Sequence, residues 1–193
     1  EYGRPADEVF AHIDPKPLGS ASLAQVHRAT LKTGEDVAIK VQRPGVRETM
    51  AQDVSIMRSI AKAATKVIRT SQIVDLKGVV EELWDTFESE TDFLIEARNL
   101  AEFKRFSVRF KYMDCPTVYA ELCTEHVVVM EYIDGISVSH PGQLIDAGYD
   151  LKEIGTKLVD NYATQILDDG FFHADPHPGN ILIRGGQIVL IDL

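Results

Sequence analysis

The sequence predicts an α+β fold, in which a small lobe with an antiparallel sheet and long inserted helices precedes the start of a helical lobe. Residues 17–42 are typical of strands joined by a turn at Lys32-Thr-Gly-Glu35. Apolar residues then recur every three or four positions from Val46 to Ile68, which indicates a helix. Two apolar runs separated by Gly185-Gly186 indicate a late hairpin. We expect the small lobe to span residues 1–135 and the second lobe to span 136–193.

The composition places limits on the class of protein. The chain has 193 residues, enough for one large domain or two lobes, and 45% of them are apolar. Its net charge, 20 − 30 = −10, argues against nonspecific binding to nucleic acid or to an anionic membrane. Cys115 and Cys123 lack C-x-x-C spacing and are expected to be reduced packing thiols of a cytoplasmic protein. There is no signal peptide and no apolar run of about 18 residues.

The first strands carry a loop of small residues. Residues 1–16 are expected to form a lead-in helix and loop. After them, Gly19-x-Ala21-x-x-Ala24-x-Val26 has the register of the phosphate loop of protein kinases, with alanine at the second and third glycine positions. Each alanine adds a Cβ, which disfavours positive φ and close backbone approach to a phosphate. By itself, this pattern also fits an ordinary turn of small residues.

The strand that follows, Asp36–Gln42, contains Val37-Ala38-Ile39-Lys40, the sequence of the lysine-bearing strand of protein kinases. Ala38 would leave room for an adenine, and Lys40 would reach the α- and β-phosphates of a nucleotide. A strand-end lysine that extends into solvent is the alternative. The small-residue loop before this strand favours the nucleotide interpretation.

Two helical stretches follow, from Pro44 to about residue 68 and over about 73–106. The apolar stripe of the first stretch is expected to face the core rather than a cofactor. The second contains an acidic block, most of which is expected to be an exposed face. One glutamate must pair with Lys40 if the chain binds nucleotide as kinases do; we assign this to Glu96, with Glu90 as second choice.

Two further strands are predicted at Cys115–Tyr119 and His126–Tyr132, and a helix is predicted over Leu151–Asp169 with Gly170 as its cap. The second strand runs into Met-Glu-Tyr-Ile-Asp-Gly, which resembles the segment between the lobes of a kinase. There the backbone of Glu131 and Ile133 would hydrogen-bond the edge of adenine. An ordinary core strand and turn is the alternative.

The last stretch, residues 173–193, has the spacing of a kinase catalytic loop. Asp175 and Asn180 are five positions apart, and Asp192 follows the predicted hairpin. A carboxylate would orient the attacking hydroxyl, while Asn180 and Asp192 would hold Mg²⁺ against phosphate oxygens. A turn sequence and a His173-x-Asp175-x-His177 metal triplet are the alternatives. We assign the two histidines to loop structure.

The order of these motifs predicts a protein-kinase-like fold that binds ATP or ADP with Mg²⁺. The runs P-L-G-S-A-S-L-A-Q-V-H-R-A, E-T-D-F-L-I-E-A-R-N and H-A-D-P-H-P-G-N-I-L resemble the UbiB/AarF atypical kinase-like family over about residues 14–193. This resemblance implies an alanine-rich nucleotide loop and helices inserted before the glutamate that pairs with the strand lysine. It also implies a Lys40–Glu96 ion pair, Asp175 as the catalytic-loop aspartate, Asn180 and Asp192 as metal ligands, and a Glu-x-Asp motif at Glu90 and Asp92.

The chain departs from the family pattern. The family's N-terminal Lys-x-Gly-Gln element is absent, and Leu193 stands where a Phe follows the metal-binding Asp. Because the chain begins without Met and stops one residue after Asp192, we expect it to be a fragment that does not turn over alone.

The resemblance implies an atypical ATP-dependent kinase or ATPase of the UbiB type that supports synthesis of isoprenoid, ubiquinone-like quinones. Its expected partners are a nucleotide, a quinone precursor or lipid, and a biosynthetic complex, but no nucleic acid. Peripheral association with the inner membrane would come from segments outside this sequence. The alternatives are a nucleotide-binding scaffold with weak catalysis and a small-molecule phosphotransferase resembling the aminoglycoside and choline kinases. The alanine loop and the E-T-D-F-L-I-E-A block argue against the phosphotransferase.

Overall fold

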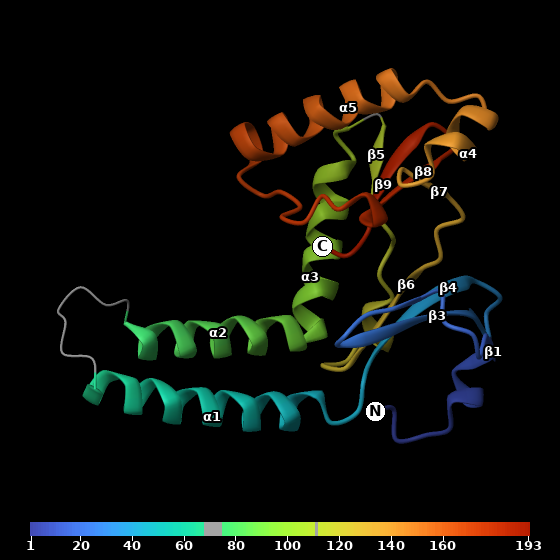
Figure 1. The fold of residues 1–193 in the computed structure, drawn as a ribbon. Coiled ribbons are helices and arrows are strands. Elements are labelled where there is room, and N and C mark those ends of the chain that lie inside the picture. Colours follow the sequence, from blue (N-terminus) through green and yellow to red (C-terminus); the bar gives the residue numbers. More distant parts are fainter. Residues whose placement is uncertain (68–74, 111) are drawn as a thin grey trace.

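The structure, a computed structural model, describes residues 1–67, 75–110 and 112–193. Within these ranges the chain forms two sheets, and a helix runs between them (Figure 1). The predicted α+β class, with an antiparallel sheet and long helices, is confirmed.

The first sheet has the strand order β1-β3-β4-β6, and the short strand β2 also pairs with β3. Neighbouring strands are antiparallel, and the turn between β3 and β4 has Gly34 at a φ of 104°. The three strands predicted within residues 17–42 are confirmed. The strand bounds are β1 Phe10–Ile13, β2 Gly19–Ser20, β3 Ala24–Leu31, β4 Asp36–Gln42 and β6 Val127–Glu131.

The prediction of a lead-in helix over residues 1–16 is wrong. A single 3₁₀ turn, η1 (Ala6–Glu8), precedes β1, which pairs with β3 through Phe10 opposite Leu31. Phe10 and Leu31 are both buried in one apolar cluster. Pairing across the sheet therefore decides the conformation of this segment, and the local turn signals do not.

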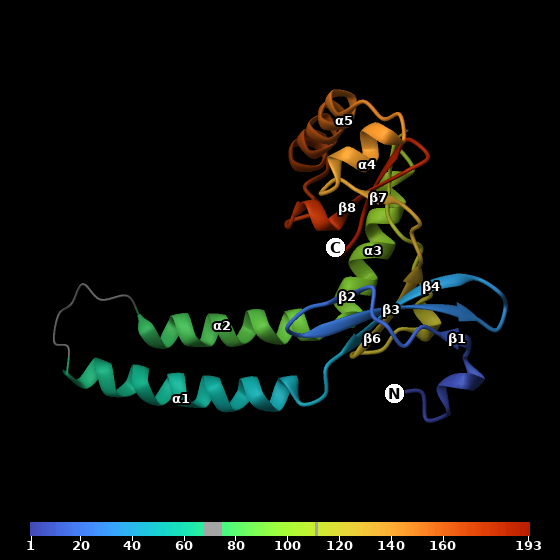
Figure 2. The ribbon, with the colours of Figure 1, turned by 45° about the vertical axis from the view of Figure 1, so that its right-hand side comes forward.

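Helices α1 (Val46–Val67) and α2 (Leu76–Thr91) form an antiparallel hairpin that extends away from the first sheet (Figures 1 and 2). Val54 and Ala61 of the predicted apolar stripe are buried, whereas Ile68 lies outside the described residues. Large apolar side chains also face solvent on both helices: Ile56, Ile60, Val79 and Leu83.

The second helical stretch is two helices rather than one. Helix α2 ends at Thr91, and α3 (Phe93–Ser107) begins after Asp92, whose side chain accepts a 3.0 Å hydrogen bond from the Leu94 amide. Asp92 is thus the N-cap of α3, a role that aspartate fills well because its carboxylate satisfies an orphan amide. The break turns the chain, so that α3 runs from the first sheet to the second (Figure 1).

The second sheet has the order β5-β9-β8-β7, and the predicted hairpin forms its centre. The strand predicted at Cys115–Tyr119 is misplaced: β5 is Met113–Asp114, and Val118 makes only an isolated bridge to Met130. The parallel pairing of β5 with β9 favours this register, because it buries Met113 in the core. The remaining strands are β7 Ile136–Ser137, β8 Ile181–Arg184 and β9 Gln187–Leu190.

Helices cover this second sheet. The predicted helix at 151–169 is confirmed as α5 (Leu151–Thr164) continued by the π-helical turn η3 (Gln165–Asp169), and Gly170 ends it at a φ of 67°. The sequence did not predict three further short elements: η2 Ala120–Leu122, α4 Pro141–Asp146 and η4 Pro178–Asn180. A shared apolar cluster joins β4, β6, α3 and the β8–β9 hairpin, so both sheets flank one core.

Candidate functional site

A cavity of about 700 Å³ lies between the two sheets. It is lined by most of the residues selected from the sequence: Gly19, Ala21, Ala24, Val26, Ala38, Lys40, Glu96, Glu131, Ile133, Asn180 and Asp192. Binding sites for small molecules typically measure about 300–1,000 Å³, so the volume suits a nucleotide. Asp175 instead lines an adjoining cavity of about 380 Å³, which shares Lys40, Glu96 and Asp192 with the larger one.

The loop of small residues forms one wall of the larger cavity. Its two strands pair through Gly19 opposite Val26, and the Ala21 amide donates to the Ala24 carbonyl over 2.9 Å. A Cβ on Gly19 would meet no atom within 4 Å, and its φ is not positive. The fold therefore does not itself require glycine at position 19. The space that the missing side chain leaves open could instead be used by a bound group.

The two alanines of this loop are not equivalent, contrary to the expectation that both alter the loop in the same way. Ala24 is buried in the apolar core, whereas Ala21 is exposed at the loop tip. Neither has a positive φ. The steric effect of a Cβ on a ligand therefore falls on Ala21, while the methyl of Ala24 contributes to packing.

Lys40 is the centre of a partly buried cluster of charges. Its Nζ donates to Glu96 Oε2 over 2.7 Å and also pairs with Asp192 Oδ1. The side chains of Lys40 and Glu96 are only 17% and 12% exposed, which strengthens their attraction. Burial alone would lower the pKa of Lys40, but the attraction of Glu96 and Asp192 outweighs burial and raises that pKa. Lys40 is therefore a cation at neutral pH.

Glu96 is fixed by α3 and reaches β4 across the core. Burial raises its pKa, and the neighbouring Lys40 opposes that rise. Its second oxygen, Oε1, is buried without a hydrogen-bond partner among the described residues. Glu90, the second choice from the sequence, lines the cavity but forms no hydrogen bond or ion pair with Lys40 within the described part of the chain.

The loop from residue 173 to Asn180 is held by one buried histidine. The Asp175 amide donates to His173 Nδ1 over 3.2 Å, and His173 Nε2 lies 3.0 Å from the Ile191 carbonyl. An Nδ1 that accepts implies an Nε2 that donates, so the imidazole is neutral and both nitrogens are engaged. His177 accepts from the Gly179 amide in the same loop. These bonds give both histidines a role in loop structure.

Asn180 and Asp192 supply oxygen atoms on the same side of the cavity. The Asn180 amide nitrogen donates to the Asp175 carbonyl over 3.3 Å, which leaves its Oδ1 for a ligand. Asp192 is half exposed and adopts a left-handed backbone with φ at 65°, which Asp tolerates better than most residues. Amide and carboxylate oxygens suit Mg²⁺. No group of three or more His, Cys, Asp or Glu side chains within the described ranges could hold a metal alone.

The segment that leaves β6 also lines the larger cavity. The Glu131 amide donates to the Thr117 carbonyl over 2.8 Å, and Val37 pairs with Glu131 in the sheet. The Glu131 amide is therefore already bonded, so its carbonyl and the Ile133 amide are the backbone groups to consider for a ligand. Ala38 pairs with Met130 beside them.

Sequence reasoning missed Arg43, which anchors the small-residue loop. Its guanidinium donates to the Ala21 carbonyl over 3.0 Å and to Ser20 Oγ over 2.5 Å. Its backbone amide donates to the Leu23 carbonyl over 2.8 Å. Its position three residues after Lys40 was the available signal, but a lysine or arginine after a strand is too common to select.

The chain is similar to known proteins over its whole length. The whole chain, residues 1–193, matches the family described as ABC1 atypical kinase-like domain. A Clostridium pasteurianum protein described as an uncharacterized protein in the hydrogenase 1 5′ region is 43% identical over 192 residues, all of this chain and 36% of its own length. A probable protein kinase UbiB of Azotobacter vinelandii is 40% identical over 187 residues, 97% of this chain and 35% of that protein.

Among solved structures, the Rv3197–erythromycin complex from Mycobacterium tuberculosis is similar, with a TM-score of 0.78 and 31% identity. The match covers 96% of this chain and 46% of that one. The chain thus spans about a third of the length of the curated relatives it matches. The predicted protein-kinase-like fold is confirmed.

Proposed function

The chain belongs to the ABC1 atypical kinase-like family, and on this basis we propose that it is the nucleotide-binding part of a UbiB-type kinase or ATPase. The observation that carries the proposal is the Lys40–Glu96–Asp192 cluster beside Asn180, at the junction of the two cavities. A buried lysine with raised pKa offers a permanent cation for a polyphosphate.

Each wall of the larger cavity has a proposed role. The Glu131 carbonyl and Ile133 amide bind the edge of adenine, and Ala38 and Val26 contact its ring faces. Lys40, held by Glu96, binds the α- and β-phosphates. The loop from Gly19 through Ala21 and Ala24 covers the phosphates from above.

The catalytic side faces the smaller cavity. Asp175 accepts the proton of an attacking hydroxyl or orients water, because it is the exposed carboxylate of the loop that His173 fixes. Asn180 and Asp192 hold Mg²⁺ together with the nucleotide, and the ion neutralises phosphate charge when bound. The acceptor is proposed to enter from this second cavity.

The wider role is proposed from the named relatives. A probable protein kinase UbiB among them supports a role in the synthesis of isoprenoid quinones, with a quinone precursor or lipid and a biosynthetic complex as partners. Among the described residues, none of the helices combines the length and apolar character that a membrane crossing requires. The proposal also includes a lobe boundary near residue 135. It further includes a cytoplasmic location, with peripheral membrane attachment through other segments.

The proposal is tested by titrating the full-length protein with ADP and with ATP, with and without Mg²⁺, by calorimetry. Wild type is expected to bind both, and Mg²⁺ is expected to strengthen binding. Asp192→Asn removes a carboxylate ligand and is expected to weaken Mg²⁺-dependent binding by about tenfold or more. Asp53→Asn, a matched change on exposed α1, is the control.

Absence of nucleotide binding by wild type, or unchanged Mg²⁺ dependence in Asp192→Asn, would contradict the proposal. Phosphate release by the full-length protein separates an enzyme from a scaffold. Faster ATP loss in the presence of a quinone precursor or lipid supports the enzyme, and nucleotide binding without turnover supports the scaffold.

A further inference from the structure

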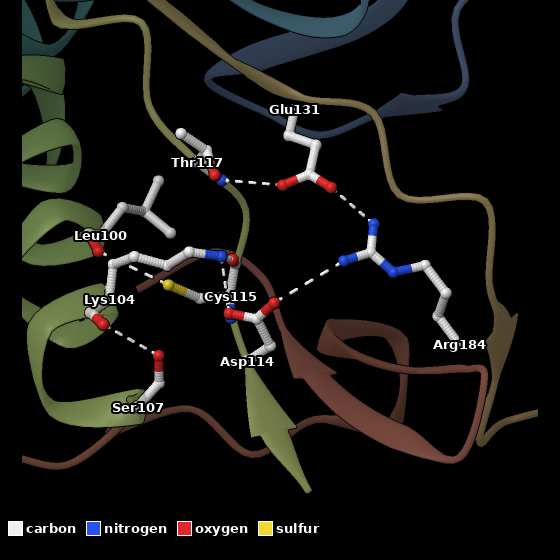
Figure 3. Close-up of polar contacts among 8 residues, drawn as sticks. All are labelled: Leu100, Lys104, Ser107, Asp114, Cys115, Thr117, Glu131 and Arg184. Carbon is white, nitrogen blue, oxygen red and sulfur yellow. Dashed lines mark hydrogen bonds and ion pairs between the residues drawn. The ribbon is translucent and has the colours of Figure 1, made fainter. Parts of the chain in front are cut away.

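Four alternating charges form a chain of ion pairs that begins at Glu131, which lines the larger cavity (Figure 3). Glu131 ends β6 in the first sheet, Arg184 ends β8 in the second, Asp114 ends β5, and Lys104 lies on α3. These residues come from four elements, and Arg184 lies 53 residues from Glu131 in the chain. None was selected for this arrangement from the sequence alone.

The contacts of this chain are specific. Arg184 Nη1 lies 2.5 Å from Glu131 Oε1, and Arg184 Nη2 lies 3.6 Å from Asp114 Oδ2. Asp114 Oδ1 in turn accepts from Lys104 Nζ over 2.6 Å. One planar guanidinium thus joins two carboxylates, which a lysine ammonium cannot do with the same geometry.

Glu131 uses its whole side chain in this arrangement. Its second oxygen, Oε2, accepts from the Thr117 amide over 3.2 Å, while its own amide donates to the Thr117 carbonyl. The attraction of Arg184 outweighs burial and lowers the pKa of Glu131. The carboxylate is therefore ionised at neutral pH, and its position is fixed from both sides.

The backbone beyond Glu131 is also packed closely onto β8. A Cβ added to Gly135 would lie 3.1 Å from the Ile183 carbonyl and 3.2 Å from the Leu182 Cβ. Gly135 lines the cavity, as do Glu131 and Ile133. The segment 131–135 therefore contacts β8 at both ends of the segment. Glu131 pairs with Arg184, and Gly135 packs against Leu182 and Ile183.

From this geometry we propose that Arg184 is a positioning residue for the adenine-binding edge. By holding Glu131 against β8, it fixes where the Glu131 carbonyl and Ile133 amide face the cavity, without touching the nucleotide. Its link through Asp114 to Lys104 ties this edge to α3, the helix that also carries Glu96. The inference rests on the proposed nucleotide function and adds to it a determinant of base selectivity.

Loss of this positioning should affect recognition of the adenine base more than binding of the phosphates. Two backbone groups discriminate adenine from guanine only if their positions are fixed, since guanine presents the reverse pattern of donor and acceptor at the corresponding edge. Loss of Arg184 releases one end of the segment and leaves Glu131 and Asp114 without their shared cation. Binding of ADP should then weaken, and the preference for ADP over GDP should fall.

The test measures dissociation constants of ADP and GDP for the full-length protein, well below its melting temperature. Arg184→Met, which keeps the length of the side chain, is expected to weaken ADP binding about tenfold and to lower the ADP-to-GDP preference by a similar factor. Arg184→Lys retains a cation for Glu131 and is expected to fall between Arg184→Met and wild type. Arg58→Met, which removes the Arg58–Glu81 pair from the distant α1–α2 hairpin, is the matched control.

Each outcome decides the matter. A reduced preference in Arg184→Met, with the Arg58→Met value equal to wild type, supports the inference. A lower melting temperature with an unchanged ADP-to-GDP preference overturns it and leaves the proposed function in place. Failure of wild type to bind ADP overturns the proposed function itself, and with it the inference.

Discussion

Two ion pairs in this protein differ in how far their side chains are removed from water. Beside the cavity, Lys40 and Glu96 are 17% and 12% exposed and join β4 to α3. On the α1–α2 hairpin, Arg58 and Glu81 are 43% and 41% exposed, although Arg58 contacts both carboxylate oxygens. The better geometry is thus found where water screens the charges, and the less symmetrical pair is found where screening is weak.

The comparison shows that contact geometry alone does not indicate what an ion pair contributes. An exposed pair adds little to stability because water and salt screen it. A buried pair gains little over an apolar replacement, but removal of one partner strands a charge. The cavity cluster is therefore expected to be sensitive to single changes, and the hairpin pair is expected to tolerate them.

The largest effect is expected from Lys40→Met. It strands the Glu96 and Asp192 carboxylates, and the free energy of unfolding should fall by about 2–4 kcal/mol. Arg58→Met should leave it nearly unchanged. Urea unfolding followed by circular dichroism measures both.

The loss of stability in Lys40→Met should depend on pH, because Glu96 titrates. Because burial raises its folded-state pKa above the unfolded value, the folded state gains stability as the pH falls through that pKa. Part of the loss in Lys40→Met should therefore be recovered at mildly acidic pH, and Lys40→Met/Glu96→Gln should recover it at neutral pH. Equal losses in Lys40→Met and Arg58→Met would show that burial does not distinguish the two pairs.

A smaller effect is expected within the loop of small residues. Ala24→Gly removes a methyl from the core and adds backbone freedom, at a cost of about 1–2 kcal/mol of unfolding free energy. Ala21→Gly is exposed and should cost less, but it opens space at the phosphate side of the cavity and should raise the affinity for ATP relative to ADP. Thermal unfolding and calorimetric titration of both full-length variants separate the effects.

The opposite assignment would reverse the roles of the two alanines. If Ala24→Gly changed the ATP-to-ADP affinity ratio while Ala21→Gly only lowered the melting temperature, the packing role assigned to Ala24 would be wrong.

Much of this arrangement could be predicted from the sequence, for a physical reason. The Lys40 strand, the hairpin before Asp192 and the Asp175–Asn180 spacing are local patterns, and their backbone conformations follow from nearby residues. The choice of Glu96 over Glu90 came from the requirement that a glutamate pair with the strand lysine, and the structure places Glu96 at Lys40.

What could not be predicted depends on contacts between distant segments. Phe10 forms a strand because β3 pairs with it, and Met113 enters the second sheet because β9 lies beside it. Arg43 and Arg184 carry no local signal specific enough to select them, since their side-chain partners lie more than twenty residues away in the chain. The break at Asp92 had a capping signal, but the continuous apolar pattern on both sides obscured it.

Among the residues that line the cavity, the smallest effect is expected at Glu131, whose pKa Arg184 lowers despite burial. A carboxylate with a lowered folded-state pKa stabilises the fold above its unfolded pKa of 4.5, and this stabilisation is lost as the pH falls through the folded-state value. Since Glu131 is partly exposed, we expect about 0.5 kcal/mol after screening. Wild type should therefore lose more unfolding free energy than Glu131→Gln between about pH 7 and about pH 4. Glu81→Gln, whose native carboxylate is also held by an arginine, should show a still smaller difference from wild type because water surrounds that pair. Urea unfolding of wild type, Glu131→Gln and Glu81→Gln at the two pH values measures these differences. Equal differences for the two glutamates would mean that water screens Glu131 as strongly as it screens Glu81.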